Sequence, residues 1–187
     1  MPRGDRAFYA PYLKRSFKDV PGSAICFEPF FDGIGYGGKP CRPGFNLQVT
    51  PELAEQLRTE GWKVSSWKKD PDDPNEETTY FIKLNFSQIR QREDGSMYPE
   101  VYEVVNDGYP ISITEETIVT LQNIRKSAIE HFDVTFHGYA YDEGHAMNQT
   151  AYVDDFIIFV KSVGIRERYA DLFNRSGVPD EEPPFEP

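Results

Sequence analysis

The most regular hydrophobic pattern in the chain predicts a single well-defined α-helix. Leu53 and Leu57 recur at the spacing that places apolar side chains on one helix face. Thr50 can cap the N-terminus, Pro51 suits the first helical position, and Gly61 is typical of a helix end. We therefore predict a helix of about ten residues between Thr50 and Gly61.

Elsewhere the hydrophobic residues cluster over short stretches, which predicts β-strands separated by polar turns rich in Gly and Pro. The predicted strands cover residues 23–31, 45–49, 63–68, 78–86 and 101–105, and residues 131–141 and 151–162 form a final hairpin. Residues 114–122 predict a second short helix, and residues 166–173 a last helical turn. About seven strands and two short helices predict a mainly β domain that closes as a small barrel or sandwich.

Composition supports a β-rich core, because 39% of the residues are hydrophobic and 14% are aromatic. No stretch approaches the roughly 18 apolar residues of a membrane span, and the N-terminus lacks the apolar segment of a secretory signal. We therefore expect a cytoplasmic protein with no membrane partner. Cys26 and Cys41 are too few for a disulfide framework, which agrees with a reducing compartment.

Charge is distributed unevenly along the chain. Residues 1–69 contain 11 Lys and Arg against 7 Asp and Glu, whereas residues 70–187 contain 9 against 24. The net charge of −11 is therefore the sum of a basic N-terminal third and a strongly acidic remainder. Asymmetry of this kind is typical of a protein with one part that faces nucleic acid and another that contacts proteins.

Cationic and aromatic residues interleave throughout the basic part, which is the combination that binding of single-stranded DNA requires. Cations neutralise phosphates and release counterions, and aromatic faces stack on bases for about 1 to 3 kcal/mol each. Core packing explains most of the Phe residues equally well, whereas Tyr and Trp rings tolerate a wet surface. We expect base stacking by Tyr36, Trp62 and Trp67. The expected contacts to the DNA backbone are Lys14, Arg15, Lys18, Lys39, Arg42, Lys63 and Lys68.

The segment 32–44 contains five glycines together with Tyr36, Lys39 and Arg42. Such a loop can fold over a nucleic-acid strand, and the alternative is a plain hairpin tip. It does not match the phosphate-binding loop of nucleotide hydrolases, so the sequence does not support nucleotide hydrolysis.

No catalytic or metal-binding pattern is recognisable, and we predict neither an enzyme nor a cofactor. His131, His137 and His145 are spaced by six and eight residues, which matches no compact zinc pattern. Asp154 and Asp155 are adjacent in a predicted strand, so their side chains point to opposite faces and form a poor metal site.

The C-terminal segment 176–187 has four prolines, four carboxylates and one aromatic residue, which predicts a disordered acidic tail. An extended chain with carboxylates and one apolar anchor can dock into a basic-rimmed pocket of another protein. We expect partner binding by Asp180, Glu181, Glu182 and Phe185, and the alternative is an end that only promotes solubility.

Several segments together resemble the bacteriophage-type single-stranded DNA-binding proteins that have an oligonucleotide-binding (OB) fold. They are YLKRSFKDVPGSAICFEPFF, the Gly- and Lys-rich loop after it, PELAEQLRTEGWKV, the hairpin FDVTFHGYAYDEG with TAYVDDFIIFV, and the DEEPPF tail. The resemblance implies an OB-fold-like five-stranded barrel with extra strands, one or two short helices and a disordered acidic tail. It divides the chain into an N-terminal arm (1–11), a binding domain (12–175) and the tail (176–187).

The resemblance also implies a function. A protein of this family protects single-stranded DNA without sequence preference during phage replication, recombination and repair, and its tail recruits replication or recombination proteins. A homo-oligomer is compatible with the sequence. Two other classes remain open: an acidic adaptor that mimics DNA and inhibits a host protein, and a structural virion protein whose aromatic residues all serve the core.

Overall fold

The computed structural model describes residues 13–140 and 143–161. The predicted N-terminal arm, the helical turn at 166–173 and the acidic tail with Asp180, Glu181, Glu182 and Phe185 lie outside the described residues. The helices are α1 (Pro51–Glu60) and α2 (Ile118–Gln122). The strands are β1 (Lys14–Pro21), β2 (Ile25–Phe30), β3 (Gly44–Val49), β4 (Val64–Trp67), β5 (Thr79–Asn85), β6 (Arg90–Gln91), β7 (Met97–Tyr98), β8 (Glu100–Val105), β9 (Ile111–Ser112), β10 (Ile129–Tyr139) and β11 (Thr150–Val160).

Nine of these strands form one sheet whose main path runs in the order β1-β10-β11-β5-β3-β2. β5 has β3 along one edge and shares its other edge between β4 and β11. β11 likewise pairs with β10 on one side and shares the other between β5 and β8, both in parallel. The sheet therefore branches where β5 meets β11, and β6 and β7 form a separate small hairpin between β5 and β8.

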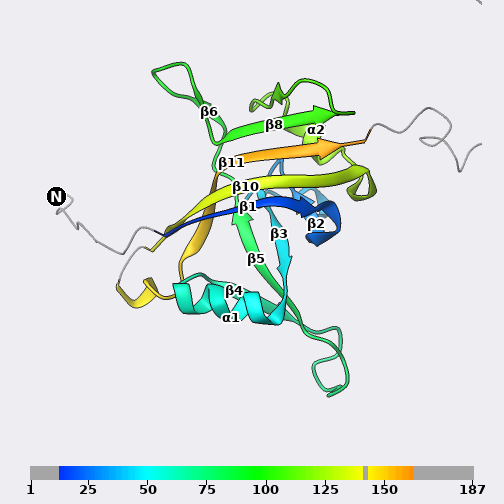
Figure 1. Cartoon of the computed structure of the whole chain (residues 1–187), viewed down its shortest axis with the longest axis vertical. Coiled ribbons are helices and arrows are strands. Elements are labelled where there is room, and N and C mark those ends of the chain that lie inside the picture. The colour runs from blue at the N-terminus through cyan, green and yellow to red at the C-terminus, as the bar shows by residue number, and fades with distance from the viewer. Residues whose placement is uncertain (1–12, 141–142, 162–187) are drawn as a thin grey trace, which may run out of the picture.

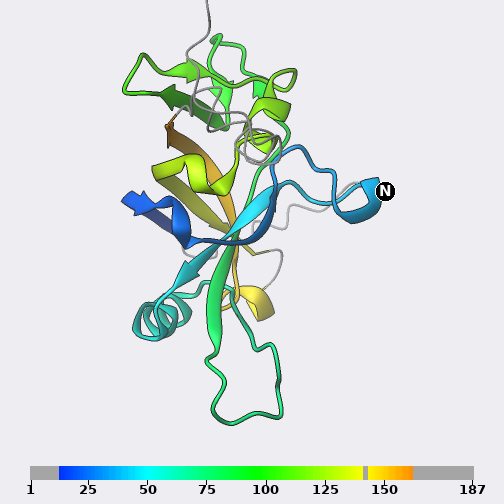
Figure 2. The same cartoon turned by 90° about the vertical axis from the view of Figure 1, so that its right-hand side faces the viewer.

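Figure 1 shows the two layers that this branching produces: β1, β10 and β11 run across the view, and β3 and β5 cross them at a steep angle. The long β10–β11 hairpin bends between the layers at a bulge after Thr135. The 90° turned view in Figure 2 shows α1 at one end of the crossed strands and the β4–β5 loop extending beyond it.

The core fills the space between these layers with aromatic rings. Phe45 lies 5.5 Å from Phe132 and 5.2 Å from Phe156, measured between ring centroids, and none of the three is more than 1% exposed. Full burial of one such side chain contributes about 1.5 to 3 kcal/mol, so these rings are a main source of the stability of the fold.

The helix α1 closes one end of the core, as the sequence predicts. The Thr50 hydroxyl accepts a hydrogen bond from Leu53 N, 3.2 Å away, and Gly61 ends the helix with a φ of 114°. Leu57 is completely buried. Because Gly61 turns the chain back, Trp62 enters the core and packs edge-on against Phe136 at 4.9 Å.

The predicted mainly β, OB-like fold with extra strands and short helices is confirmed, and the described strands form an open sheet rather than one closed by hydrogen bonds. All seven predicted strands are present with small shifts of their ends. β1 was not predicted, because in this edge strand charged residues separate the half-buried Phe17 and Val20.

Candidate nucleic-acid interface

The candidate interface is the face of the β3-β5-β4 sheet that points away from the core, called the outer face here. On β5, the buried Ile82 and Leu84 alternate with Phe81 and Lys83, which therefore point to the outer face. Residues in register on neighbouring strands share a face, so Asn46 of β3 lies beside Lys83 on this side of the sheet.

A pocket of about 350 Å³ opens on the outer face and is rich in positive charge. Its lining consists of Arg42, Asn46, Lys63, Ser65, Phe81, Lys83, Asn85, Thr150 and Ala151. Three of these residues are cationic, no carboxylate lines the pocket, and none of the three cations takes part in an ion pair within the described chain. Because like charges repel one another, a bound anion such as a phosphate would stabilise this cationic pocket.

The three cations come from distant parts of the sequence, and the local backbone explains how they meet. Gly44 has a φ of 151°, and a Cβ atom there would lie 2.3 Å from Leu84 O. Only glycine allows β3 to approach β5 so closely. Lys63 is placed by its backbone N–H, which donates to Gln149 O at 2.9 Å.

An aromatic platform of Phe27, Trp67 and Phe81 adjoins one side of the cationic pocket. The Phe27 ring meets Trp67 at 5.6 Å and Phe81 at 5.1 Å between centroids, edge to face in both cases. Phe27 is 38% and Trp67 48% exposed. Phe81 belongs to both the platform and the pocket, so stacking surface and positive charge are continuous.

A second aromatic group, the tyrosine cluster of Tyr139 and Tyr152, adjoins the other side of the pocket. Tyr152 is in register with Asn85 of the pocket, and its ring meets that of Tyr139 at 6.1 Å. His137 stacks on Tyr152 at 6.0 Å, and its Nδ1 lies 2.7 Å from Asp154 Oδ1. The His137–Asp154 contact fixes the ring against which Tyr152 rests.

The interface contains four of the residues predicted from the sequence. Arg42 and Lys63 line the pocket, and Trp67 belongs to the platform. Lys14 is exposed on β1 in register with His137, so it lies on the same side as the tyrosine cluster.

Tyr36 and Lys39 lie on the β2–β3 loop, which also contains Arg42 of the pocket, but they do not line the pocket themselves. Tyr36 is 74% exposed and packs edge-on against Phe30. The loop is structured, since Gly35 N donates to Lys39 O at 2.7 Å.

Lys18 and Lys68 do not line the cationic pocket. Lys18 is exposed on β1, and Lys68 lines a separate hollow with Pro71 and Tyr80.

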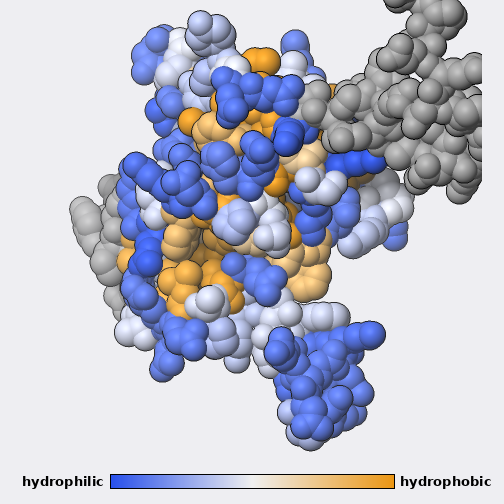
Figure 3. All heavy atoms as spheres, turned by 45° about the vertical axis from the view of Figure 1, so that its right-hand side comes forward, coloured by the Kyte–Doolittle hydropathy of each residue, from blue (hydrophilic) through white to orange (hydrophobic). Residues whose placement is uncertain are grey.

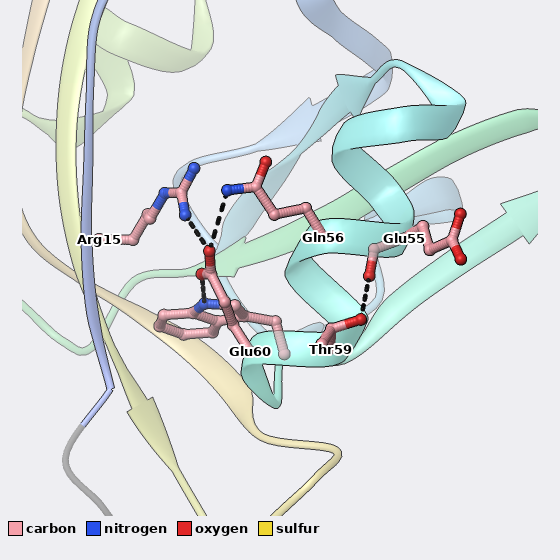
Figure 4. Close-up of polar contacts among 6 residues, drawn as sticks. Arg15, Glu55, Gln56, Thr59 and Glu60 are labelled. Carbon is pink, nitrogen blue, oxygen red and sulfur yellow. Dashed lines mark hydrogen bonds and ion pairs between the residues drawn. The ribbon is translucent and has the colours of Figure 1, made fainter.

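Trp62 and Arg15 are corrections to the sequence-based prediction. Trp62 is 2% exposed, so its ring offers no face to a base, and the prediction that it stacks is wrong. Its Nε1 donates to Glu60 Oε2 at 3.2 Å. Glu60 also pairs with Arg15 and accepts from Gln56 (Figure 4), so the Arg15 charge serves to dock β1 on α1 instead of facing a ligand.

The sequence-based reasoning missed Phe27, Phe81, Lys83, Tyr139 and Tyr152. For Phe81 and Lys83 the signal was their alternation with the apolar Ile82 and Leu84. The same alternation marks Tyr152 between the buried Ala151 and Val153, and Tyr139 after the buried Phe136. Phe27 carries no such local signal, because a bulge turns its ring to the outer face.

Other features of the described chain offer less to an anionic ligand. The larger hollow beside Thr50, of about 770 Å³, has Glu77 as its one charged lining residue. Burial raises the pKa of the Cys26 thiol, which keeps this side chain protonated and poorly nucleophilic. Within residues 13–140 and 143–161 no group of three potential metal ligands occurs, and no helix could span a membrane.

Comparisons with known proteins found a likeness to a solved structure. No protein-family model and no curated protein matches the sequence. The crystal structure of gp2.5, a single-stranded DNA-binding protein encoded by bacteriophage T7, is similar over 93% of this chain and 100% of that chain, with 12% identity and a TM-score of 0.34.

Proposed function

We propose that the chain is a non-enzymatic protein that binds single-stranded DNA on the outer face, without sequence preference. The observation that carries the proposal is the cationic pocket, which no carboxylate lines and which lies between two groups of partly exposed aromatic rings. Phosphates would occupy the pocket while neighbouring bases stack on the platform and on the tyrosine cluster.

Single strands suit this surface better than duplexes. In a duplex the faces of the bases are stacked on one another and unavailable to protein rings, whereas a single strand can present them. Stacking accepts every base, so it supports binding that ignores sequence.

The resemblance in sequence to phage single-stranded DNA-binding proteins supports a wider cellular role. The protein would coat single-stranded DNA in the cytoplasm of an infected cell, protect it during phage replication, recombination and repair, and recruit partner proteins through its acidic tail. The resemblance, and not the geometry, supports the tail's part in this role.

The alternative of an acidic DNA mimic predicts carboxylates arranged along one face. In the described chain the β4–β5 loop alone contains five carboxylates, at Asp70, Asp72, Asp73, Glu76 and Glu77. This loop stands out as a hydrophilic lobe in Figure 3. The other carboxylates of the acidic part are spread over further loops and strands, such as the β6–β7 turn and β10. This distribution does not reproduce the regular phosphate spacing of a duplex, so it favours DNA binding over mimicry.

The test is a fluorescence-anisotropy titration with a labelled oligo-dT of roughly 30 nucleotides beside a duplex of equal length. We expect tighter binding of the single strand, and weaker binding by a Lys83→Glu variant, because the reversed charge repels phosphate. Absence of single-strand binding at low salt, in a folded wild-type protein, would contradict the proposal. If the protein instead captured a DNA-binding protein of the host, that result would favour the acidic DNA mimic.

A further inference from the structure

The backbone of Phe27 has an unusual conformation for so large a residue. Its φ is 60°, in the left-handed region, and the pairing of β2 with β3 is irregular between Cys26 and Phe30. A bulky residue in this region is strained and persists only where its surroundings hold it. Such positions cluster at binding sites.

The bulge changes the face to which the Phe27 ring points. Ile25 is buried in register with Leu47, and Cys26 is in register with Asn46 of the outer face. In a regular strand the next side chain, Phe27, would return to the core side with Ile25. Because of the bulge the ring instead lies on the outer face, against Trp67 and Phe81.

Two side chains from a distant segment hold the bulge in place. Gln122 of α2 donates from Nε2 to Pro29 O at 2.8 Å and accepts at Oε1 from Phe31 N at 2.6 Å. Lys126 donates from Nζ to Phe27 O at 3.1 Å. Together they provide polar partners for the backbone of the bulged stretch.

We propose that Gln122 and Lys126 are positioning residues for binding of single-stranded DNA, and that Phe27 is the base-contacting ring that they position. This inference rests on the proposed function and extends it to a segment that lies outside the pocket. The strain at Phe27 is retained because it completes the aromatic platform.

A double-mutant cycle between Gln122→Met and Phe27→Ala tests the proposal. Methionine keeps the volume of glutamine and removes both hydrogen bonds. We expect Phe27→Ala to weaken binding of oligo-dT about 5- to 150-fold, the equivalent of one lost base stack. Gln122→Met should weaken binding in the wild-type background and have no further effect beside Phe27→Ala, because it acts through that ring.

The emission of Trp67 gives a second measurement that needs no DNA. In a Trp62→Phe background Trp67 is the one tryptophan left. Displacement of Phe27 should expose the Trp67 ring to water. We therefore expect the Trp67 emission of Gln122→Met and of Lys126→Met to shift to the red and to be quenched more strongly by acrylamide. Arg125→Met, which removes the same charge from the exposed neighbouring residue, should leave the emission unchanged. This comparison separates the hydrogen bond of Lys126 from its charge.

The backbone strain at Phe27 is tested by comparing the unfolding temperatures of two variants, Phe27→Gly and Phe27→Ala. Glycine adopts a positive φ without cost, so Phe27→Gly should unfold at a higher temperature than Phe27→Ala, although glycine is normally the more destabilising residue.

Equal losses of affinity from Gln122→Met in both backgrounds, or unchanged Trp67 emission in both Gln122→Met and Lys126→Met, would overturn the proposal. If Gln122→Met does not fold, Lys126→Met replaces it in the cycle. Failure of the wild-type protein to bind DNA would instead count against the proposed function, while the emission still reports whether Gln122 and Lys126 position Phe27.

Discussion

Removing two of the three pocket cations should change the salt dependence of DNA binding by a calculable amount. Binding of a single strand weakens with salt with a log–log slope of about −0.7 for each phosphate contact. If Arg42, Lys63 and Lys83 each contact one phosphate, they account for a slope of about −2. The variant Lys63→Ala/Lys83→Ala should retain about −0.7 of this contribution.

The same relation predicts the loss of affinity. At 0.1 M salt two lost contacts correspond to about 25-fold weaker binding, and the difference should vanish on extrapolation to about 1 M salt. The assay is an anisotropy titration with oligo-dT at four or more salt concentrations. Thermal unfolding should show no loss of stability, because the variant removes like charges that have no partner within the described chain.

Lys161→Ala is the matched control for the single variants Lys63→Ala and Lys83→Ala, each of which should lose about 0.7 of the slope. Lys161 directly follows the C-terminal end of β11, whereas the pocket residue Thr150 begins this strand, so the variant removes one positive charge far from the pocket. Its salt slope should equal that of the wild-type protein. An unchanged slope in Lys63→Ala/Lys83→Ala, or an equal change in Lys161→Ala, would refute the assignment of phosphates to the pocket.

Three further outcomes follow from the structure. Trp67→Ala should weaken oligo-dT binding by about 1 to 3 kcal/mol, because the ring provides the stacking face. Trp67→Phe should retain most of the affinity, and equal losses in the two variants would contradict stacking. Gly44→Ala should lower the melting temperature, because a Cβ there meets Leu84 O at 2.3 Å, and an unchanged melting temperature would show that β3 can move away from β5. Burial raises the pKa of Glu103 in the folded state above its value in the unfolded chain. As the pH rises, the unfolded chain therefore releases the proton first, and the folded state is less stable at neutral than at acidic pH. Glu103→Gln should therefore raise the melting temperature at pH 7 more than at pH 3, and equal shifts would remove the carboxylate as the cause.

Local signals predicted the elements of this fold well. α1 was predictable because its cap, its apolar spacing and its terminal glycine are all encoded within twelve residues, from Thr50 to Gly61. The β10–β11 hairpin was predictable because both strands have long runs of β-forming residues. β1 was missed because pairing with β10 stabilises it, and its own sequence reads as charged and irregular.

Site residues were predictable only in part, and the two tryptophans show why. Both lie in the same basic stretch, five positions apart, and both have lysine as a neighbour. The turn at Gly61 directs Trp62 into the core beside Phe136, while Trp67 ends an edge strand and remains 48% exposed. Composition cannot separate them, because burial depends on which elements pack above each ring.

By itself the sequence determined what depends on neighbours along the chain: a mainly β domain, one capped helix, a basic and aromatic N-terminal part, and an acidic remainder. Only the tertiary structure decided which of the cations meet. Arg42, Lys63 and Lys83 are each about twenty residues apart, and they line one pocket because β3 and β4 flank β5. The physical reason is that strand pairing and the bulge at Phe27 depend on long-range contacts, such as those of Gln122, which no local pattern encodes.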